Sequence, residues 1–578
     1  MIRLAFLSAL SLVLTSCASG PSGSGFQAAL SRAKSDAVTI ETARTYGDFS
    51  KARYASLTND PETAAQSYAT VIQQVPEDAT IGERAVFSAL MVGDVALAIE
   101  LAEGLPVETL DQTELPRLIL AVDAIASGED IQSLSSLNRP WIRPFHALMA
   151  RSLVAWSALE SDPENALQLQ SNAGGADPIL NAVAKTLAAL MKISQGDDDG
   201  ALAALTQNWD NNIRLAVGVE AQVRLLSQAG RDEEARQLLN AFRQDIGRNP
   251  ALMALSRELY AGDVAPPQRR TIQQGAALAI YAATAALAVD SDNDLPAVYF
   301  APSVYLDPNL DAAKTLWADV LDRADRRNEA MSLLVSIPDT SPFHTSAQGQ
   351  LAWVLRREGF DDEALALARE TLKRTNNRNI RIQLADLLIS LGRDGEGEDT
   401  LSDVIADDAA RGHYDWRIYF ARGAARERLG YWPPAENDLQ TAIGLAPDEA
   451  SLLNYLGYAW IDRGINLQDG LSLIEKAVRL KPMNGAITDS LGWAHYKLQN
   501  YDRAVFYLEL AVSLEPQDSE ILDHLGDAYW QVGRYTEAGY QWERALLYVE
   551  DDKDRAAITA KLSSGLSMIK AVGVRGGS

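Results

Sequence analysis

Apolar residues recur along most of the chain at the spacing of amphipathic helices. In residues 178–195 and 213–229 they follow one another every three or four positions, without the strict alternation of a half-buried strand. Asp177 before Pro178 adds a helix start, because an aspartate side chain can accept free amide hydrogens and a proline ring fits the first turn. The pattern predicts an all-α protein.

A set of small and apolar residues returns with a period of 34 near the C-terminus. Leucine, glycine and alanine occupy the matching positions, which are Leu491 and Leu525, Gly492 and Gly526, Ala504 and Ala538, and Ala511 and Ala545. Small side chains let antiparallel helices approach each other closely, and a proline such as Pro516 ends the second helix. Weaker matches at the same spacing, such as Ala330 with Ala364, extend upstream. The sequence therefore predicts consecutive helix hairpins of similar length.

This period and these residue types resemble the tetratricopeptide repeat (TPR) family. The resemblance covers residues 345–550 as six consecutive repeats, some degenerate, and residues 40–258 as diverged hairpins of the same kind. It implies an all-α fold, a right-handed superhelical solenoid of antiparallel helix hairpins. A glycine in the left-handed conformation would end the first helix of a hairpin. The candidates for this role are Gly359, Gly392, Gly430, Gly464 and Gly533, with Gln499 as the exception.

Two proline-bearing breaks, residues 262–270 and 295–308, interrupt the predicted repeats, because no continuous helix tolerates such prolines. They are either long loops or the junction between two superhelical arms, and we interpret them as the junction. The predicted organisation is a signal peptide at 1–16, a lipidated cysteine and flexible tether at 17–38, diverged repeats at 39–262, a Pro-rich junction with a helix at 263–308, a TPR array at 309–550, and a capping helix and tail at 551–578.

The N-terminus has the layout of an export signal. Arg3 precedes an apolar run from Leu4 to Leu14 that is too short to span a membrane, and small residues lead to Cys17, the only cysteine of the chain. This layout resembles a bacterial lipobox; the alternative is an ordinary secretory signal with an incidental cysteine. The resemblance implies cleavage before Cys17 and acyl chains such as palmitate that anchor this residue in a lipid bilayer, facing the periplasm. Ala18, in place of an inner-membrane retention aspartate, favours the outer membrane by analogy.

The charge of the chain restricts its partners. It has 52 basic and 78 acidic residues, a formal net charge of −26. Nucleic acid is bound through Lys and Arg side chains that neutralise phosphates, so we expect no nucleic-acid partner. We expect proteins or peptide segments of the cell envelope instead.

The TPR resemblance also implies a binding face, because the first helices of TPR hairpins line a concave groove. Its ligand-facing repeat positions, carried onto this sequence, give a polar and aromatic set that we call the predicted row: Asn454, Tyr458, Asp462, Asp489, Trp493, Tyr496, Lys497, Asp523, Asp527 and Trp530. The alternative is that the rings pack between adjacent first helices and the carboxylates are solvated. Because only Lys497 in this row is basic, we expect a neutral or basic peptide segment rather than an anionic tail.

The sequence carries no motif of catalytic or metal chemistry. The five histidines form no HExxH or Cys/His set, and residues 290–294 begin like a calcium loop but Leu295 stands where a glycine is required. We therefore expect no metal, no cofactor and no enzymatic activity. The expected function is a lipid-anchored periplasmic scaffold for envelope assembly. The alternatives are the superhelical frame of a peptidoglycan hydrolase, or an activator of one, and a self-assembling structural element; oligomeric state and partner identity stay open.

Overall fold

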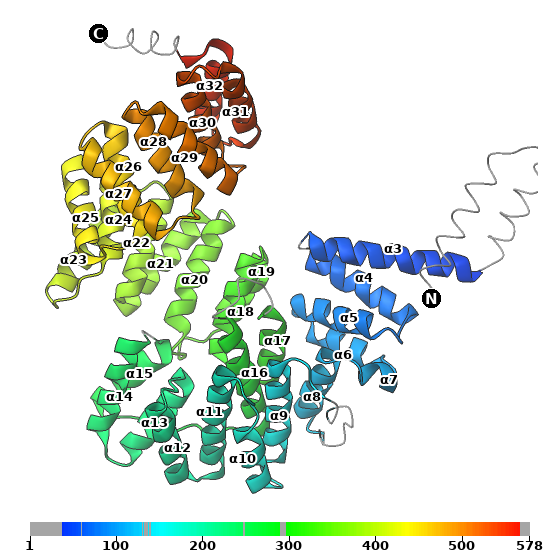
Figure 1. Cartoon of the computed structure of the whole chain (residues 1–578). Helices are drawn as coiled ribbons and strands as arrows, with labels where there is room; N and C mark the ends of the chain where they lie inside the picture. The colour runs from blue at the N-terminus through cyan, green and yellow to red at the C-terminus, as the bar shows by residue number, and fades with distance from the viewer. Residues whose placement is uncertain are drawn as a thin grey trace, which may run out of the picture. The chain divides into compact units, whose positions relative to one another are not determined.

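The chain folds into helices throughout the part that the structure describes. The computed structural model describes residues 37–566, apart from residues 59, 130, 132–136, 138–139, 247–248 and 289–295. These residues contain no strand, which confirms the predicted all-α class of TPR-type hairpins (Figure 1). The signal peptide, Cys17, the tether up to residue 36 and the Asp-rich segment 290–294 lie outside the described residues.

The described residues divide into two compact units, one up to Val354 and one from Leu355 onward. The helices of the first unit are α3 (Ala37–Leu57), α4 (Pro61–Gln74), α5 (Ala79–Met91), α6 (Val95–Glu103), α7 (Val107–Leu110), α8 (Leu115–Ser127), α9 (Pro144–Ala158), α10 (Pro163–Ser171), α11 (Pro178–Gln195), α12 (Asp198–Asp210), α13 (Ala216–Gln228), α14 (Asp232–Asp245), α15 (Pro250–Ala261), α16 (Ile272–Ala288), α17 (Ala297–Leu306), α18 (Asp311–Arg323) and α19 (Arg327–Val335).

The division falls within α20 (His344–Arg357). The helices of the second unit are α21 (Asp361–Thr375), α22 (Arg378–Ser390), α23 (Asp394–Ala409), α24 (Trp416–Arg428), α25 (Trp432–Leu445), α26 (Ala450–Arg463), α27 (Leu467–Leu480), α28 (Gly485–Lys497), α29 (Tyr501–Leu514), α30 (Ser519–Gln531), α31 (Tyr535–Tyr548) and α32 (Asp552–Ser564).

Helix hairpins of the second unit follow the predicted repeat marks. α24 packs on α25, α26 on α27, α28 on α29 and α30 on α31. A Cβ placed on Gly492 of α28 would lie 2.6 Å from Leu508 Cγ of α29, so only glycine permits this approach. All five glycines expected to end first helices have positive φ, and Gln499 adopts the same left-handed conformation with φ 62°.

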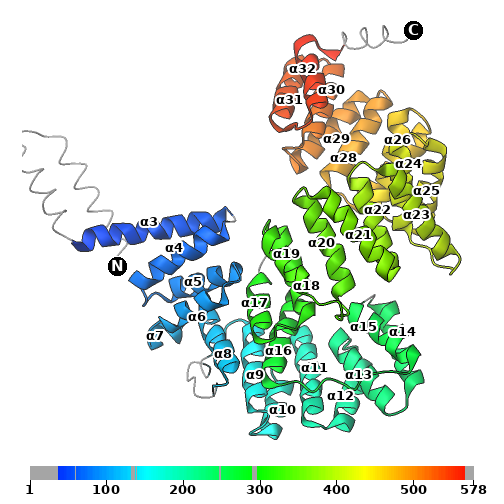
Figure 2. The same cartoon turned by 180° about the vertical axis from the view of Figure 1, so that it is seen from behind.

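The first unit is built differently. Most of its core is one cluster of buried residues that extends from Ala52 to Leu306. Helix α16 packs against α8, α9 and α11, and α17 packs against α5, α6 and α8 (Figures 1 and 2). After α15, the chain therefore returns to helices from much earlier in the sequence, from α5 to α11.

This return involves residues 263–308, the segment that the sequence analysis interprets as a junction between two arms. The segment lies within the first unit, and Gly275 of α16 is in such close contact with Trp156 of α9 that a Cβ there would lie 2.2 Å from the indole ring. The prolines interrupt the regular repeat, and the apolar helices that follow them bury side chains in the core of the first unit.

Candidate functional site

The predicted row lies on three consecutive first helices of the second unit, α26, α28 and α30. The hairpin repeat brings residues of equal repeat position next to one another, since each first helix packs on the next. The structure separates the row into three parts with different surroundings: an open cavity, a stack of rings and a covered end.

The open part contains Asn454, Tyr458, Asp462 and Asp489. These four side chains line one cavity of about 390 Å³, together with Glu427, Tyr455, Arg463, Asp518 and Glu520. Asp489 is only 5% exposed, so it forms part of the floor, whereas the Asp462 side chain is 53% exposed at the edge. At this end of the row, the predicted residues therefore lie around one cavity.

The cavity is rich in hydrogen-bond acceptors. Arg463 pairs with Glu427 at 2.7 Å and Lys497 pairs with Asp462 at 3.1 Å, which neutralises two of its acids. The amide oxygen of Asn454 is buried and has no hydrogen-bond partner within the described chain. Burial raises the pKa of Glu520, with the neighbouring Asp489 and Asp518 adding to the rise against the opposing effect of His524. A ligand that brings donors would satisfy these groups.

The middle of the row is a stack of rings. Trp493 lies parallel to Tyr496 with ring centroids 4.7 Å apart, and on His524 of the next first helix with centroids 4.0 Å apart. The Lys497 ammonium lies 5.2 Å from the Trp493 ring. These rings join α28 to α30. In this part of the row the aromatic side chains therefore pack between adjacent first helices, the alternative to a ligand-facing role.

His524, one of the stacked rings, also pairs with a carboxylate. Its Nδ1 lies 3.0 Å from both carboxylate oxygens of Asp489. Burial alone would lower the pKa of His524, but the Asp489 carboxylate outweighs this effect and raises the pKa to about 9. The imidazolium–carboxylate pair therefore fixes α28 against α30 at neutral pH.

The C-terminal part of the row is covered by α32. The Lys561 ammonium lies 2.6 Å from Asp523 Oδ2 and 2.9 Å from Asp527 Oδ2. Asp527 is 5% exposed and also accepts a hydrogen bond from the Trp542 indole. Burial raises the pKa of Asp527 to about 6, against the opposing charge of Lys561. At this end the expected ligand-facing carboxylates are held by the chain itself.

Trp530 is covered in the same way. A Cβ on Gly565, just after α32, would lie 2.2 Å from its indole, and the Tyr535 ring packs 4.5 Å away on the other hairpin helix. Helix α32, which ends at Ser564, lies in the segment after residue 551 that the sequence analysis assigns to a capping helix and tail.

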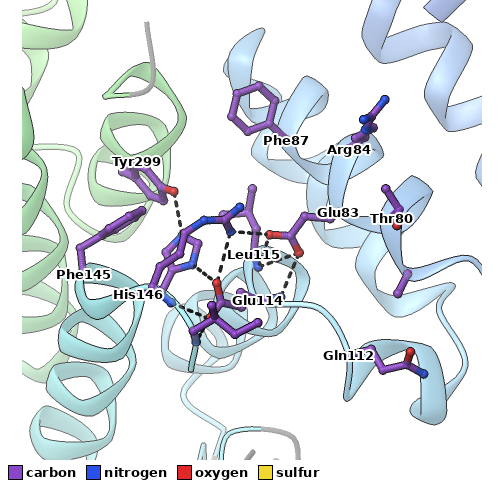
Figure 3. A pocket seen from close by; sticks show the side chains of 13 residues that line it. Thr80, Glu83, Arg84, Phe87, Gln112, Glu114, Leu115, Phe145, His146 and Tyr299 are labelled. Carbon is purple, nitrogen blue, oxygen red and sulfur yellow. Dashed lines mark hydrogen bonds and ion pairs between the residues drawn. The ribbon is translucent and has the colours of Figure 1, made fainter. Parts of the chain in front are cut away.

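A second cavity, which the sequence reasoning missed, lies in the first unit. It has a volume of about 590 Å³ and is lined by side chains of α5, the start of α8, the start of α9 and Tyr299 of α17 (Figure 3). Glu114 is 5%, His146 1% and Tyr299 2% exposed. His146 connects the other two, with Nδ1 3.1 Å from Glu114 and Nε2 2.7 Å from the Tyr299 hydroxyl.

Two glutamates organise this cavity by capping helices other than their own. Glu83 of α5 accepts from the amides of Glu114 and Leu115 at the start of α8. Glu114 accepts from the amides of Ile142 and Arg143 before α9. Burial would raise the pKa of Glu114, but these bonds and the one to His146 lower it to about 2. The sequence did contain a signal for these caps. Glu114 and Arg143 stand at the starts of α8 and α9, which a proline marks, and neither side chain caps its own helix.

Neither unit offers a metal site in the described residues, where no three or more His, Asp or Glu side chains gather suitably. Among the same residues, no helix is both long and apolar enough to cross a membrane.

Comparisons with known proteins support the TPR resemblance. Residues 490–518, which run from within α28 to just past the end of α29, match the family model of the tetratricopeptide repeat. A TPR repeat-containing protein of Pseudomonas aeruginosa is 36% identical over 83 residues, which are 14% of this chain and 14% of that protein. The chain thus matches only a small part of that relative's length.

Solved structures with helical repeats are also similar. The APC/C hetero-tetramer Cut9–Hcn1 is 15% identical with a TM-score of 0.38, and the match covers 91% of this chain and 96% of that one. A tetratricopeptide repeat protein from Parabacteroides merdae is 13% identical with a TM-score of 0.36, covering 43% and 96%. Similarity at this level says nothing about a shared ligand.

Proposed function

We propose that this protein is a lipid-anchored scaffold of the bacterial periplasm that binds protein partners during cell-envelope assembly. TPR hairpins form protein-interaction surfaces rather than catalytic centres, and the repeat match and the helical fold support the general role. The observation that carries the proposal is the cavity at the open end of the predicted row, lined by Asn454, Tyr458, Asp462 and Asp489.

The ligand of this cavity is a basic peptide segment. Acidic side chains predominate in its wall, and Asp518 and Glu520 have no basic side chain within ion-pair distance in the described chain. The Asn454 amide oxygen would accept from a backbone N–H, while the Tyr455 and Tyr458 rings provide apolar contact area. Lys561 at the covered end of the row shows the same chemistry within the molecule, because its ammonium lies between two row carboxylates.

A peptide titration tests the cavity. The full chain is titrated with two fluorescein-labelled, C-terminally amidated peptides, Gly-Lys-Leu-Lys-Gly and its counterpart with Glu in place of Lys. We expect saturable binding of the basic peptide only, and at least a tenfold loss in the double variant Asn454→Ala with Tyr458→Ala. Tyr540→Ala, which removes an exposed ring elsewhere on the unit, is the control. Equal binding of both peptides, or an unaffected double variant, would refute the assignment.

The anchor part of the proposal rests on Cys17 and the segment before it. Metabolic labelling with an alkyne-tagged palmitate, followed by membrane fractionation, tests it. The natural chain should be labelled and sediment with the outer membrane, whereas Cys17→Ser should be unlabelled and leave the membrane fraction. A labelled Cys17→Ser protein, or an unlabelled natural chain, would rule out the lipid anchor at this residue.

A further inference from the structure

The cavity of the first unit has acceptors that are already satisfied. Glu83 Oε2 accepts from two amides, and Oε1 from the Leu115 amide and from Arg143. Glu114 Oε1 accepts from the Ile142 and Arg143 amides, and its Oε2 from Arg143 and His146. Each carboxylate oxygen therefore accepts two hydrogen bonds, with the Leu115 N–H shared between the two oxygens of Glu83, so these negative charges serve to hold α8 and α9 in place (Figure 3).

The donors of the same cavity are not satisfied. The guanidinium of Arg84 has the Tyr68 hydroxyl, at 3.3 Å, as its only polar partner in the described chain. Arg143 uses Nη1 for both glutamates, and its side chain is still 51% exposed. Both carboxylates of this cavity are paired, whereas the Arg84 guanidinium has no ion-pair partner in the described chain, so the cavity favours an anionic group.

The apolar wall of the cavity consists largely of rings. Phe87 comes from α5 and Phe145 from α9, and Phe145 meets Tyr299 edge to face with centroids 5.5 Å apart. Tyr299 belongs to α17, which the chain itself lays against α5 and α8. Next to the cavity, α5 and α8 thus already pack against a helix that contributes an aromatic side chain, Tyr299 of α17. The cavity lies beside this helix contact.

From these observations we infer that the cavity is a second binding site, for a partner segment that carries an aromatic side chain beside an aspartate or glutamate. The ring packs among Phe87, Phe145 and Tyr299, and the carboxylate meets the Arg84 guanidinium at the rim. Aromatic rings prefer edge-to-face contacts of the kind that Phe145 and Tyr299 already make. Arginine binds a carboxylate through two parallel N–H groups, which fixes the orientation of the bound carboxylate and also contributes affinity.

This site differs in chemistry from the cavity of the second unit. The two cavities select segments of opposite charge, so one scaffold can hold two different partners. The inference does not depend on the proposed role of the predicted row, and the variants that test the two sites do not overlap.

Fluorescence anisotropy of the full chain tests the second site. The probe is fluorescein-labelled Gly-Gly-Phe-Glu-Gly-Gly amide, in which the glutamate side chain is the only carboxylate of the peptide. Two comparison peptides replace Glu by Gln or Phe by Ala. We expect saturable binding of the probe and at least a tenfold weaker affinity for each comparison peptide.

Protein variants locate the site. Arg84→Gln and Phe87→Ala should each weaken probe binding about tenfold or more, and Arg84→Lys should retain more affinity than Arg84→Gln. Arg243→Gln is the matched control, because it removes the same charge from an exposed position on α14 of the same unit. The double variant Asn454→Ala with Tyr458→Ala should bind the probe normally.

Circular dichroism and thermal unfolding of each variant show whether it is folded. The inference is overturned if the natural chain binds no probe saturably up to millimolar concentration, or if the Gln and Glu peptides bind equally. It is also overturned if folded Arg84→Gln binds the probe as well as Arg243→Gln does.

Discussion

The two units make a solenoid core in different ways. In the second unit, buried residues form separate clusters, each shared by neighbouring hairpins, such as the cluster of Ala385, Leu401, Val404 and Ile418. In the first unit, one cluster extends from Ala52 to Leu306 because α16 and α17 return to α5, α8, α9 and α11.

This difference determines how far a local change spreads. A repeat array whose hairpins contact only their neighbours behaves as a chain of coupled elements, so damage stays near its origin. Where segments that are distant in the sequence share one core, the stability of that core depends on all of them, so local damage affects the whole core. The first unit is therefore expected to unfold as one cooperative block, and the second in parts.

The largest expected effect comes from a pair of buried tryptophans, Trp156 in the first unit and Trp542 in the second, 0% and 1% exposed. Trp156→Ala should destabilise the first unit by about 3–5 kcal/mol, because it leaves a cavity where α9 meets α16. Hydrogen exchange should then accelerate throughout the helices that the large cluster joins, from α4 to α12 and in α16 and α17. Trp542→Ala should accelerate exchange only in α28–α32. Acceleration confined to α9 and α10 in Trp156→Ala would contradict the single-block account.

Glu114→Gln is expected to have the next largest effect. It breaks a buried network of charged groups and should cost the first unit on the order of 3 kcal/mol at neutral pH. Because the folded-state pKa of Glu114 is lowered to about 2, its contribution is present above the ordinary value of 4.5 and is lost as the pH falls towards 2. Urea unfolding should show the natural chain and the variant converging over that range. A constant difference down to pH 2 would contradict the network.

His524→Gln tests the α28–α30 contact in the second unit. The pKa of His524 is raised to about 9 from an ordinary 6.5, so its stabilising contribution is fully present below 6.5 and is lost as the pH rises through 9. The variant should be about 2 kcal/mol less stable at pH 6 and nearly equal to the natural chain above pH 9. Chemical unfolding followed at both pH values measures this difference. An equal loss at both values would mean that the ring stack, and not the charge, joins the two helices.

The smallest expected effect compares two glycines of the second unit. Gly492→Ala places a methyl group 2.6 Å from Leu508 Cγ and should cost about 1 kcal/mol. Gly444→Ala, in α25, meets nothing within 4 Å and should stabilise by up to about 1 kcal/mol through its helix propensity. Thermal unfolding measures both. Equal shifts would mean that the hairpins do not need glycine for their close approach.

The sequence allowed the parts of the fold that depend on near neighbours to be predicted. Asp177 does cap α11, which spans Pro178–Gln195, and the 34-residue marks do lie where α28 meets α29 and α30 meets α31. The return of α16 was not predictable from a period, because the contact of Gly275 with Trp156 joins residues more than a hundred positions apart and has no repeated counterpart.

The candidate site shows the same limit. The ligand-facing positions that the TPR resemblance implies include Asn454, Tyr458, Asp462 and Asp489, and in the structure these four side chains line one cavity. The repeat positions could not show that Lys561, 38 residues beyond Asp523, covers the other end of the row. Nor could they show that Glu83 caps the start of α8 and Glu114 the start of α9. Periodicity predicts on which face of a helix a residue lies. It does not predict whether another segment of the chain packs over that face.

Site-specific photo-crosslinking in living cells tests the central claim most directly. A benzophenone amino acid replaces Tyr458 in the open cavity of the row or, as a control, Tyr540, which is 60% exposed outside that cavity. The scaffold account predicts that position 458 captures a defined envelope protein through a basic segment, identified by mass spectrometry, and that position 540 does not. The same adducts at both positions, or none at position 458, would contradict it.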